Sequence, residues 1–348
     1  MDDNGARSET IPGTATPITY SYGDLLSLEL PPDRPLIAGV MGEETGNIWG
    51  GPGGVGKSWL LMEAARAIAS GTPFLDHFPT EQHAVLVIDE ENRLRTLVQR
   101  ARMFERAAPL GPDLPITYAS LQGLRVDAAA EAAQVDALMT KHTPGLTILD
   151  SFTRVHGANE NNAGEMAAVF FNVKALMRAH RCAVLFSDHT RKRGLVNNDP
   201  GETLRGSSEK RAWPETILDV AADETERGTL VISMPKSRES EALVPFTVRL
   251  EVDNAAGTAL LRYGGEATQT QAAKGGEIIG AVHAITAQLG ADACDAATLA
   301  AYLTCSADTV RRHGTKLFTA GILTSRSVVP SAKGGKPKTV YAVAGGRE

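Results

Sequence analysis

A glycine-rich run near the start of the chain constrains its fold more than any other feature. It reads Gly51-Pro52-Gly53-Gly54-Val55-Gly56-Lys57-Ser58 and matches the pattern G-x-x-x-x-G-K-[ST]. Glycines let backbone N–H groups converge on phosphates, and a helix that follows adds its positive amino-terminal end. An apolar step at Asn47–Trp49 precedes the run, and an amphipathic helix is expected over Ser58–Ser70. The alternative is a chance glycine-rich loop, but this context predicts a phosphate-binding loop (P-loop).

The side chains of Lys57 and Ser58, together with a carboxylate from outside the run, complete a nucleotide site of this kind. Lys57 is expected to reach the β- and γ-phosphates of ATP, and the Ser58 hydroxyl to ligate Mg²⁺. A carboxylate at the end of an apolar strand must hold the rest of the Mg²⁺ shell, and Asp150 follows the apolar run Leu146–Leu149. An Asp that merely caps a turn is the alternative. The predicted cofactors are therefore ATP, bound by residues 51–58, and Mg²⁺, bound by Ser58 and Asp150.

Short apolar runs alternate with helical stretches through the first two thirds of the chain. This alternation predicts an α/β fold with a parallel sheet covered on both faces. After about Trp213 the pattern changes to consecutive strands without helices, which predicts an antiparallel extension of the sheet. Further strands are expected at 84–88, 116–119, 146–149 and 183–187, helices at 93–105, 127–141 and 165–180, and extension strands at 217–220, 229–234, 245–252 and 259–263.

Composition shifts divide the chain into segments. Residues 1–33 are rich in Pro, Gly, Ser and Thr and are predicted to be a flexible lead-in, followed by an ATPase domain over 34–263. Residues 264–276 (GGEATQTQAAKGG) resemble a linker, and 277–348 are expected to form a second domain. The net charge of −6 excludes a uniformly basic nucleic-acid coat protein, but residues 274–348 hold nine Lys/Arg against five Asp/Glu. The expected arrangement is an acidic body with a basic tail.

Other features bear on the compartment. The three cysteines form no CxxC pair, which suits a reducing compartment. No apolar run is long enough to cross a bilayer, and the polar amino terminus is unlike a secretory signal. These observations predict a cytoplasmic protein with no membrane partner.

The basic tail has its own pattern. Helices are expected at 277–288, 296–302 and 307–320, followed by strands at 322–327 and 339–343 around a lysine- and glycine-rich turn. Three helices and a basic hairpin predict a winged helix–turn–helix. A protein–protein adaptor with a solvated basic loop is the alternative. The charge favours DNA, with a duplex as the expected form at this module. Phosphate contacts are expected from Arg311, Arg312, Lys316, Lys333, Lys336 and Lys338.

Several runs in order resemble the RepA-type ATPases, RecA-fold proteins that include hexameric plasmid replicative helicases. They are VLVIDEEN, TILDSFTRVHGANENNAGEMAAV, VLFSDHTRKRG and Arg205-Gly206-Ser207-Ser208, and the resemblance covers roughly residues 35–250. It implies a RecA-like fold and a homo-oligomeric, hexameric ring. It also implies ATP between neighbouring subunits and single-stranded DNA in the central channel.

The same resemblance implies further site residues. Glu91, preferred over Glu90 by its register after the strand, is expected to orient and deprotonate the attacking water. The alternative is that both acids simply begin the next helix. His189 is expected to sense the γ-phosphate, and a structural histidine is the alternative. Arg191, Lys192 and Arg193 begin a loop expected to contact DNA in the pore, unless it is a plain surface loop.

A cationic finger from the neighbouring subunit is also implied. Lys236 and Arg238 resemble the Lys-x-Arg pair that bacterial replicative helicases use for this purpose, and a cationic β-turn is the alternative. Some plasmid helicases carry an arginine about ten residues after the Arg-Gly-Ser-Ser arginine, where this chain has Trp213-Pro214-Glu215. That departure makes Arg238 the better candidate.

Three functions compete at this point. The first is an ATP-driven helicase that moves on single-stranded DNA during replication of a plasmid or another mobile element. The second is an ATP-switched initiator, loader or regulator that binds DNA without unwinding it. The third is a RecA-like ATPase that acts on proteins, which the basic tail disfavours.

Overall fold

A computed structural model describes most of the ATPase body and short pieces of the remainder. The described residues are 19–29, 34–190, 206–223, 226–238, 241–267, 294–295, 297–298, 323–328 and 338–343. The chain divides into two units, Met1–Asp33 and Arg34–Glu348. The larger unit contains the body.

The body is built on a nine-stranded sheet with the order β3-β2-β4-β5-β1-β6-β7-β8-β9. Neighbouring strands from β3 to β6 are parallel, and β6 to β9 are antiparallel. The parallel strands carry short apolar runs that are buried on both faces, as such sheets require. The strands are β1 Gly46–Gly51, β2 Val85–Asp89, β3 Ile116–Ser120, β4 Leu146–Asp150, β5 Ala183–His189, β6 Thr216–Ala222, β7 Thr229–Ser237, β8 Phe246–Asp253 and β9 Thr258–Glu266.

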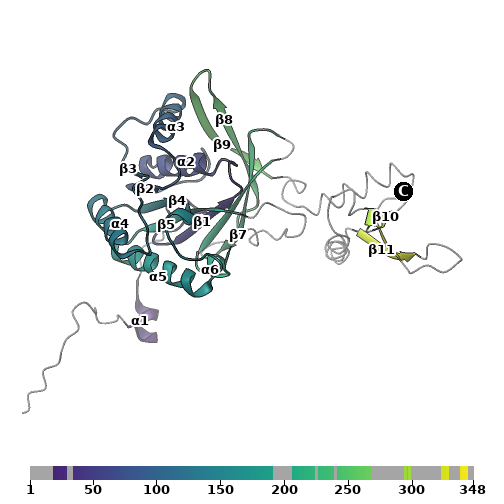
Figure 1. The fold of residues 1–348 in the computed structure, drawn as a ribbon, viewed down its shortest axis with the longest axis horizontal. Helices are drawn as coiled ribbons and strands as arrows, with labels where there is room; N and C mark the ends of the chain where they lie inside the picture. Colours follow the sequence, from purple (N-terminus) through teal and green to yellow (C-terminus); the bar gives the residue numbers. More distant parts are fainter. Residues whose placement is uncertain are drawn as a thin grey trace, which may run out of the picture. The chain divides into compact units, whose positions relative to one another are not determined.

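Helices cover both faces of the sheet (Figure 1). On one face α2 and α3 pack on a core that includes Trp49, and on the other α4 and α5 pack on a core that includes Ile48. Adjacent residues of β1 thus point to opposite cores, because side chains alternate along a strand. The helices of this body are α2 Lys57–Ser70, α3 Leu94–Ala107, α4 Ala129–His142, α5 Ala163–His180 and α6 Glu209–Ala212, with a 3-10 turn η1 at Phe152–Arg154.

The predicted mostly parallel α/β core with an antiparallel extension is confirmed. Strand β6 joins the two parts of the sheet. It pairs antiparallel with β7, as the sequence predicts for residues 217–220, and it also pairs in parallel with β1, with Asn47 opposite Thr216. The four-residue helix α6 precedes β6, and the sequence pattern does not reveal it.

The first unit contains a helix where only a flexible lead-in is expected. Helix α1 spans Tyr22–Ser27 and begins with a capping box, in which Ser21 Oγ accepts from Asp24 N and Asp24 Oδ2 accepts from Ser21 N. Its apolar residues are exposed.

In the predicted second domain the structure describes a three-stranded sheet of order β10-β12-β11. Strand β11 (Leu323–Val328) pairs antiparallel with β12 (Lys338–Val343), as expected for the two strands of the predicted hairpin, and β10 is Cys294–Asp295. The three predicted helices lie outside the described residues, so the winged helix–turn–helix stays a prediction.

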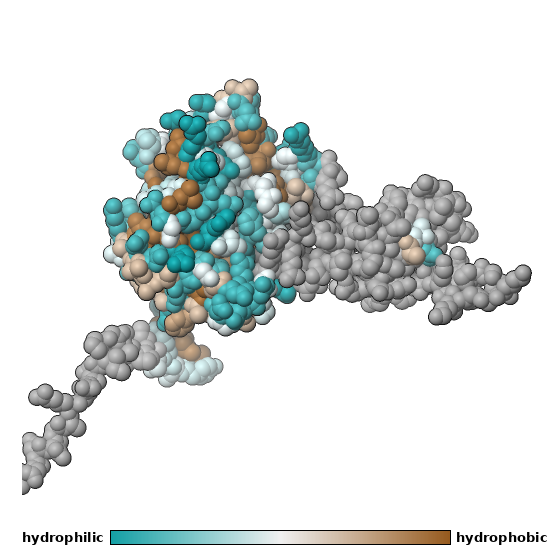
Figure 2. Space-filling model, in the orientation of Figure 1, coloured by the Kyte–Doolittle hydropathy of each residue, from teal (hydrophilic) through white to brown (hydrophobic). Residues whose placement is uncertain are grey.

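On the face drawn in Figure 2, hydrophilic residues predominate over the body and hydrophobic ones form small separate groups. Within the described residues no helix is both long and apolar enough to cross a membrane.

Candidate functional site

The glycine-rich run forms the turn between β1 and α2, as predicted. Gly54 and Gly56 have φ values of +76° and +116°, which residues with a Cβ rarely adopt. Gly56 is the N-cap of α2 and provides no side-chain acceptor, so the first N–H groups of the helix are available to an anion. Lys57 is buried, and its Nζ donates to the carbonyl oxygens of Gly51 and Pro52 at 2.8 and 3.1 Å. The loop therefore presents backbone donors and one ammonium group to the same space.

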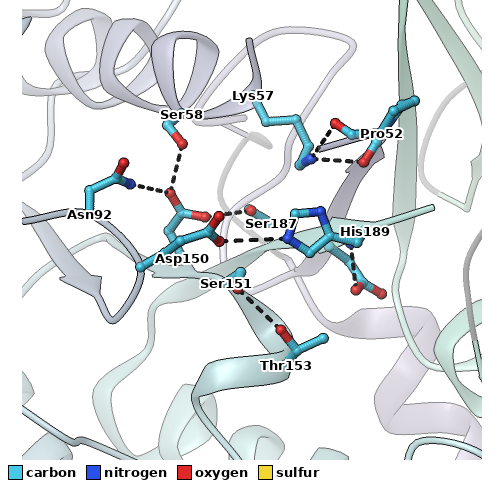
Figure 3. A network of polar contacts seen from close by, with 12 residues as sticks. Pro52, Lys57, Ser58, Asn92, Asp150, Ser151, Thr153, Ser187 and His189 are labelled. Atoms are coloured by element: carbon cyan, nitrogen blue, oxygen red, sulfur yellow. Dashed lines mark hydrogen bonds and ion pairs between the residues drawn. The ribbon is translucent and has the colours of Figure 1, made fainter. Parts of the chain in front are cut away.

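Asp150, at the carboxyl end of β4, lies directly opposite this loop. Its Oδ2 accepts from Ser58 Oγ at 3.1 Å and its Oδ1 from Ser187 Oγ at 2.5 Å. Figure 3 shows that the Ser58, Ser187 and Asn92 side chains all point toward this carboxyl group. Burial raises the pKa of Asp150 to about 6, and the nearby Asp89 and Glu91 carboxylates act in the same direction. A buried carboxyl group that is this costly to ionise is suited to bind a cation, whose charge favours the ionised form.

The acidic run after β2 divides into residues with different partners. The Glu90 carboxylate accepts from three backbone N–H groups of the turn after β3, those of Gln122, Gly123 and Leu124, at 3.0–3.1 Å. Glu91 instead has its carboxylate oxygen 3.7 Å from Nε2 of His189. The geometry thus occupies Glu90 with the fold and leaves Glu91 facing the phosphate side.

His189 is the last residue of β5, which lies between the P-loop strand and the strand of Asp150. It pairs with Gly51 in the β1–β5 register, and its side chain is 31% exposed. Because side chains alternate along β5, Ser187 and His189 share the face that carries α2. The structure therefore brings Lys57, Ser58, Asp150 and His189 to one edge of the sheet (Figure 3). Glu91 joins them through its contact with His189.

Lys236 and Arg238 do not join this group within the chain. They follow the opposite edge of the sheet, where Ser237 pairs with Thr216 at the start of β6. Lys236 Nζ donates to the carbonyls of Arg211 and Ala212 at 2.6 and 2.9 Å, and Arg238 Nη2 donates to Ala212 O at 2.7 Å. Both cations therefore cap the carboxyl end of α6. Burial and the nearby Arg238 charge lower the pKa of Lys236 to about 8.

The residues at the place of the missing arginine have structural contacts. The Trp213 ring stacks on Phe170 with centroids 4.6 Å apart, and a Cβ on Gly46 would lie 2.4 Å from Trp213. Glu215 Oε2 accepts from Gly46 N at 2.7 Å. These contacts join α5 to the start of β1.

The predicted DNA contacts are not described. Arg191, Lys192, Arg193, Arg311, Arg312, Lys316, Lys333 and Lys336 lie outside the described residues, and of Lys338 only its place at the start of β12 is given. They stay predictions.

Three residues of the site do not follow from the sequence reasoning. Ser187 binds the Asp150 carboxyl, and Asp89 accepts from the backbone N–H of Asn92 at 2.6 Å while Asn92 Nδ2 lies 3.4 Å from Asp150. The signal for Ser187 is its place two residues before His189, on the same face of a strand that ends beside the P-loop. Asp89 ends its strand in register with Asp150 on the neighbouring strand, which only the sheet order reveals.

Comparisons with known proteins place this chain among nucleotide-binding domains. A family model described as an AAA domain (AAA_25) matches residues 15–194. Among solved structures, the chain is similar to a DnaB-like replicative helicase, solved with its interactions with primase, at 11% identity and a TM-score of 0.45 over 63% of this chain and 57% of that one. It is also similar to the RadB recombinase, at 15% identity and a TM-score of 0.43 over 60% of this chain and 88% of that one. The chain thus matches less than two thirds of the length of the helicase.

Proposed function

The chain belongs to the AAA domain family AAA_25, and from that premise we propose that it is a RecA-like ATPase that works as an oligomeric replicative DNA helicase of the plasmid RepA type. The observation that carries the ATPase part is the convergence of Lys57, Ser58, Asp150, Glu91 and His189 at the carboxyl edge of the parallel sheet. The order of the motifs along the chain, which resembles RepA-type proteins, supports the helicase part.

The residues present fit a nucleotide with Mg²⁺. Mg²⁺ binds hard oxygen donors and is usually held by one or two carboxylates together with substrate phosphates. The Ser58 hydroxyl and the Asp150 carboxylate are such donors and lie 3.1 Å apart. When bound, the ion offsets negative charge on the phosphates. Ser187 then holds the second oxygen of Asp150 and so orients the carboxylate.

Hydrolysis requires a base for the attacking water and donors for the charge that develops on the phosphates. Lys57 and the N–H groups at the start of α2 supply donors in this proposal. Glu91 is the base, because its carboxylate faces the site while that of Glu90 accepts three backbone hydrogen bonds. His189 lies beside Glu91 and is the residue that responds to the γ-phosphate.

The finer parts of the proposal concern assembly and DNA. We place Arg238 and Lys236 as the cations that one subunit contributes to the site of its neighbour in a hexameric ring. Arg191, Lys192 and Arg193 contact single-stranded DNA, and the basic carboxyl-terminal segment contacts duplex DNA as a winged helix. The excess of Lys and Arg in residues 274–348 supports the DNA assignment.

The test is ATP-dependent unwinding of a duplex with a single-stranded tail. The wild-type chain should unwind it with ATP and Mg²⁺, and Lys57→Ala should abolish both turnover and unwinding. Lys141→Ala, an exposed lysine in the last turn of α4, is the matched control and should leave both unchanged.

Two outcomes would overturn the helicase assignment. Unwinding that persists in Lys57→Ala would mean that the P-loop does not drive it. DNA binding and ATP turnover without unwinding would instead support an ATP-switched initiator, loader or regulator.

A further inference from the structure

Lys210 has no exposed side-chain surface and pairs with Asp188 near the carboxyl end of β5. Lys210 Nζ is 2.8 Å from Asp188 Oδ2 and 2.8 Å from Glu160 Oε2, and it lies 4.5 Å from the centroid of the Phe152 ring. Asp188 is itself 1% exposed. A buried ammonium group is strongly unfavourable unless it is paired and hydrogen-bonded, so its partners must stay in place. The nucleotide site described above makes no use of this cluster.

The cluster joins three separate parts of the chain. Glu160 belongs to the segment that follows β4 and η1, Asp188 belongs to β5, and Lys210 belongs to α6. The backbone reinforces the junction, because Ser207 N donates to Glu160 O at 2.7 Å. Gly206, with φ +100°, lies so close that a Cβ there would be 2.5 Å from Glu160 O. These contacts therefore hold the chain in place before residues 191–205, at Asp188, and after them, at Gly206 to Lys210.

The two faces of β5 connect this cluster to the nucleotide site. Ser187 and His189 point to the face that carries α2, whereas Asp188 points to the face that carries α5 and α6. The Asp188 carboxylate uses both oxygens: Oδ2 accepts from Lys210, and Oδ1 accepts from the backbone N–H of His189 at 2.7 Å. Lys210 thus fixes the position of the Asp188 carboxylate. That carboxylate in turn fixes the backbone N–H of His189, whose ring lies on the other face of the strand.

We propose that Lys210 is a positioning residue for ATP hydrolysis, which acts through Asp188 to set the His189 side chain against Glu91. The inference rests on the proposed ATPase function. The Lys210 ammonium group also contacts Phe152 and Glu160. Of these three contacts, it is the one with Asp188 that leads to His189. This difference between the two ion pairs makes the idea testable.

The first test compares three variants. Lys210→Met removes the charge at similar length, Asp188→Asn removes the ion pair that leads to His189, and Glu160→Gln removes the other ion pair of the same lysine. Lys210→Met and Asp188→Asn should lower kcat about tenfold to a hundredfold, the size expected of a displaced group in a site, with nucleotide affinity changed less than about twofold. Glu160→Gln should retain kcat even where its midpoint of unfolding falls. An equal loss of kcat in Glu160→Gln would overturn the proposal, because it would show that the lysine merely stabilises the fold.

The second test places Lys210→Met in a His189→Ala background. If Lys210 acts through His189, the second substitution adds no further loss of kcat, since residues that act as a unit are not additive. Full additivity would overturn the proposal.

A third measurement does not depend on activity. The NMR resonance of the His189 ring can be assigned by its absence in His189→Ala. Its chemical shift should change in Lys210→Met and Asp188→Asn and should be unchanged in Glu160→Gln. An unmoved resonance would overturn the positioning role even if kcat fell. Absence of ATP turnover in the wild-type chain would refute the proposed function, while the resonance would still decide whether Lys210 positions His189.

Discussion

Replacing Asp150 by Asn should make the empty protein more stable while it removes ATP turnover. Asp150 is 3% exposed, and its carboxyl group lies near the Asp89 and Glu91 carboxylates. Asn has nearly the same shape, and the Ser58 and Ser187 hydroxyls can donate or accept as the amide requires. The substitution therefore removes a buried negative charge without opening a cavity. It also removes the proposed Mg²⁺ ligand.

The magnitude follows from the pKa. Burial raises the pKa of Asp150 from 3.8 to about 6, and one unit corresponds to about 1.4 kcal/mol. The folded state thus favours the protonated acid, so stability falls as pH rises from the unfolded pKa to the folded pKa. Above that window the penalty reaches about 3 kcal/mol, and at pH 5 it is about half as large. Because the neighbouring carboxylates share the repulsion and readjust, we expect Asp150→Asn to gain about 1–3 kcal/mol at pH 8.

Urea unfolding at pH 8 and pH 5, without nucleotide or Mg²⁺, measures this difference directly. Asp113→Asn, which replaces an exposed carboxylate, is the matched control and should change little at either pH. With Mg²⁺ and ATP the order should reverse, since ligand binding stabilises the wild-type chain more than the variant. Equal or lower stability of Asp150→Asn at pH 8 in the empty state would refute the reasoning.

Three other outcomes follow from the site. Glu91→Gln should abolish ATP turnover with little change in the midpoint of unfolding. Glu90→Gln should retain turnover but lower the free energy of unfolding by about 1–3 kcal/mol, because it weakens charge-assisted bonds to three backbone N–H groups. The reverse result, in an ATPase assay with parallel unfolding curves, would exchange their roles. Gly206→Ala should destabilise the chain by more than about 1 kcal/mol, since φ is +100° and the new Cβ meets Glu160 O; an unchanged midpoint in thermal unfolding would contradict this. Arg238→Ala, inactive alone, should regain turnover when mixed with Lys57→Ala, because each variant supplies what the other lacks at a shared site; no recovery in subunit-mixing assays would exclude a trans role.

The sequence was sufficient for most of the body of the fold. The strands that carry apolar runs were recognised because a sheet buried on both faces demands such runs, and their predicted bounds differ little from β1 to β5. The antiparallel pairing of β6 with β7 agrees with the sequence prediction. Its parallel pairing with β1 does not follow from the sequence, because Thr216–Ala222 has the same composition whether its neighbour runs parallel or antiparallel. The direction in which two strands pair depends on whether the chain crosses the sheet between them. The four-residue helix α6 is too short to produce a helical periodicity in the sequence.

The site was predicted less completely, for a similar physical reason. Lys57 and Ser58 follow from a motif whose spacing is local, and Asp150 follows from the apolar run that it ends. The choice of Glu91 over Glu90 follows from register after a strand. The sequence places Ser187 on the same strand face as His189, but its contact with Asp150 requires β5 to lie beside β4, which only the sheet order reveals. The buried charge of Lys210 was also unexpected, since a Lys flanked by Glu209 and Arg211 has the appearance of a solvent-exposed turn.

The contacts that hold the chain before and after residues 191–205 have an evolutionary consequence. Since the chain is held at Asp188 before this segment and at Gly206 to Lys210 after it, the fold does not depend on how the intervening residues are arranged. Doubling the length of chain between two fixed points adds only about 0.6 kcal/mol of closure entropy. Insertions, deletions and changes of charge can therefore accumulate between these anchors while the catalytic edge keeps its geometry.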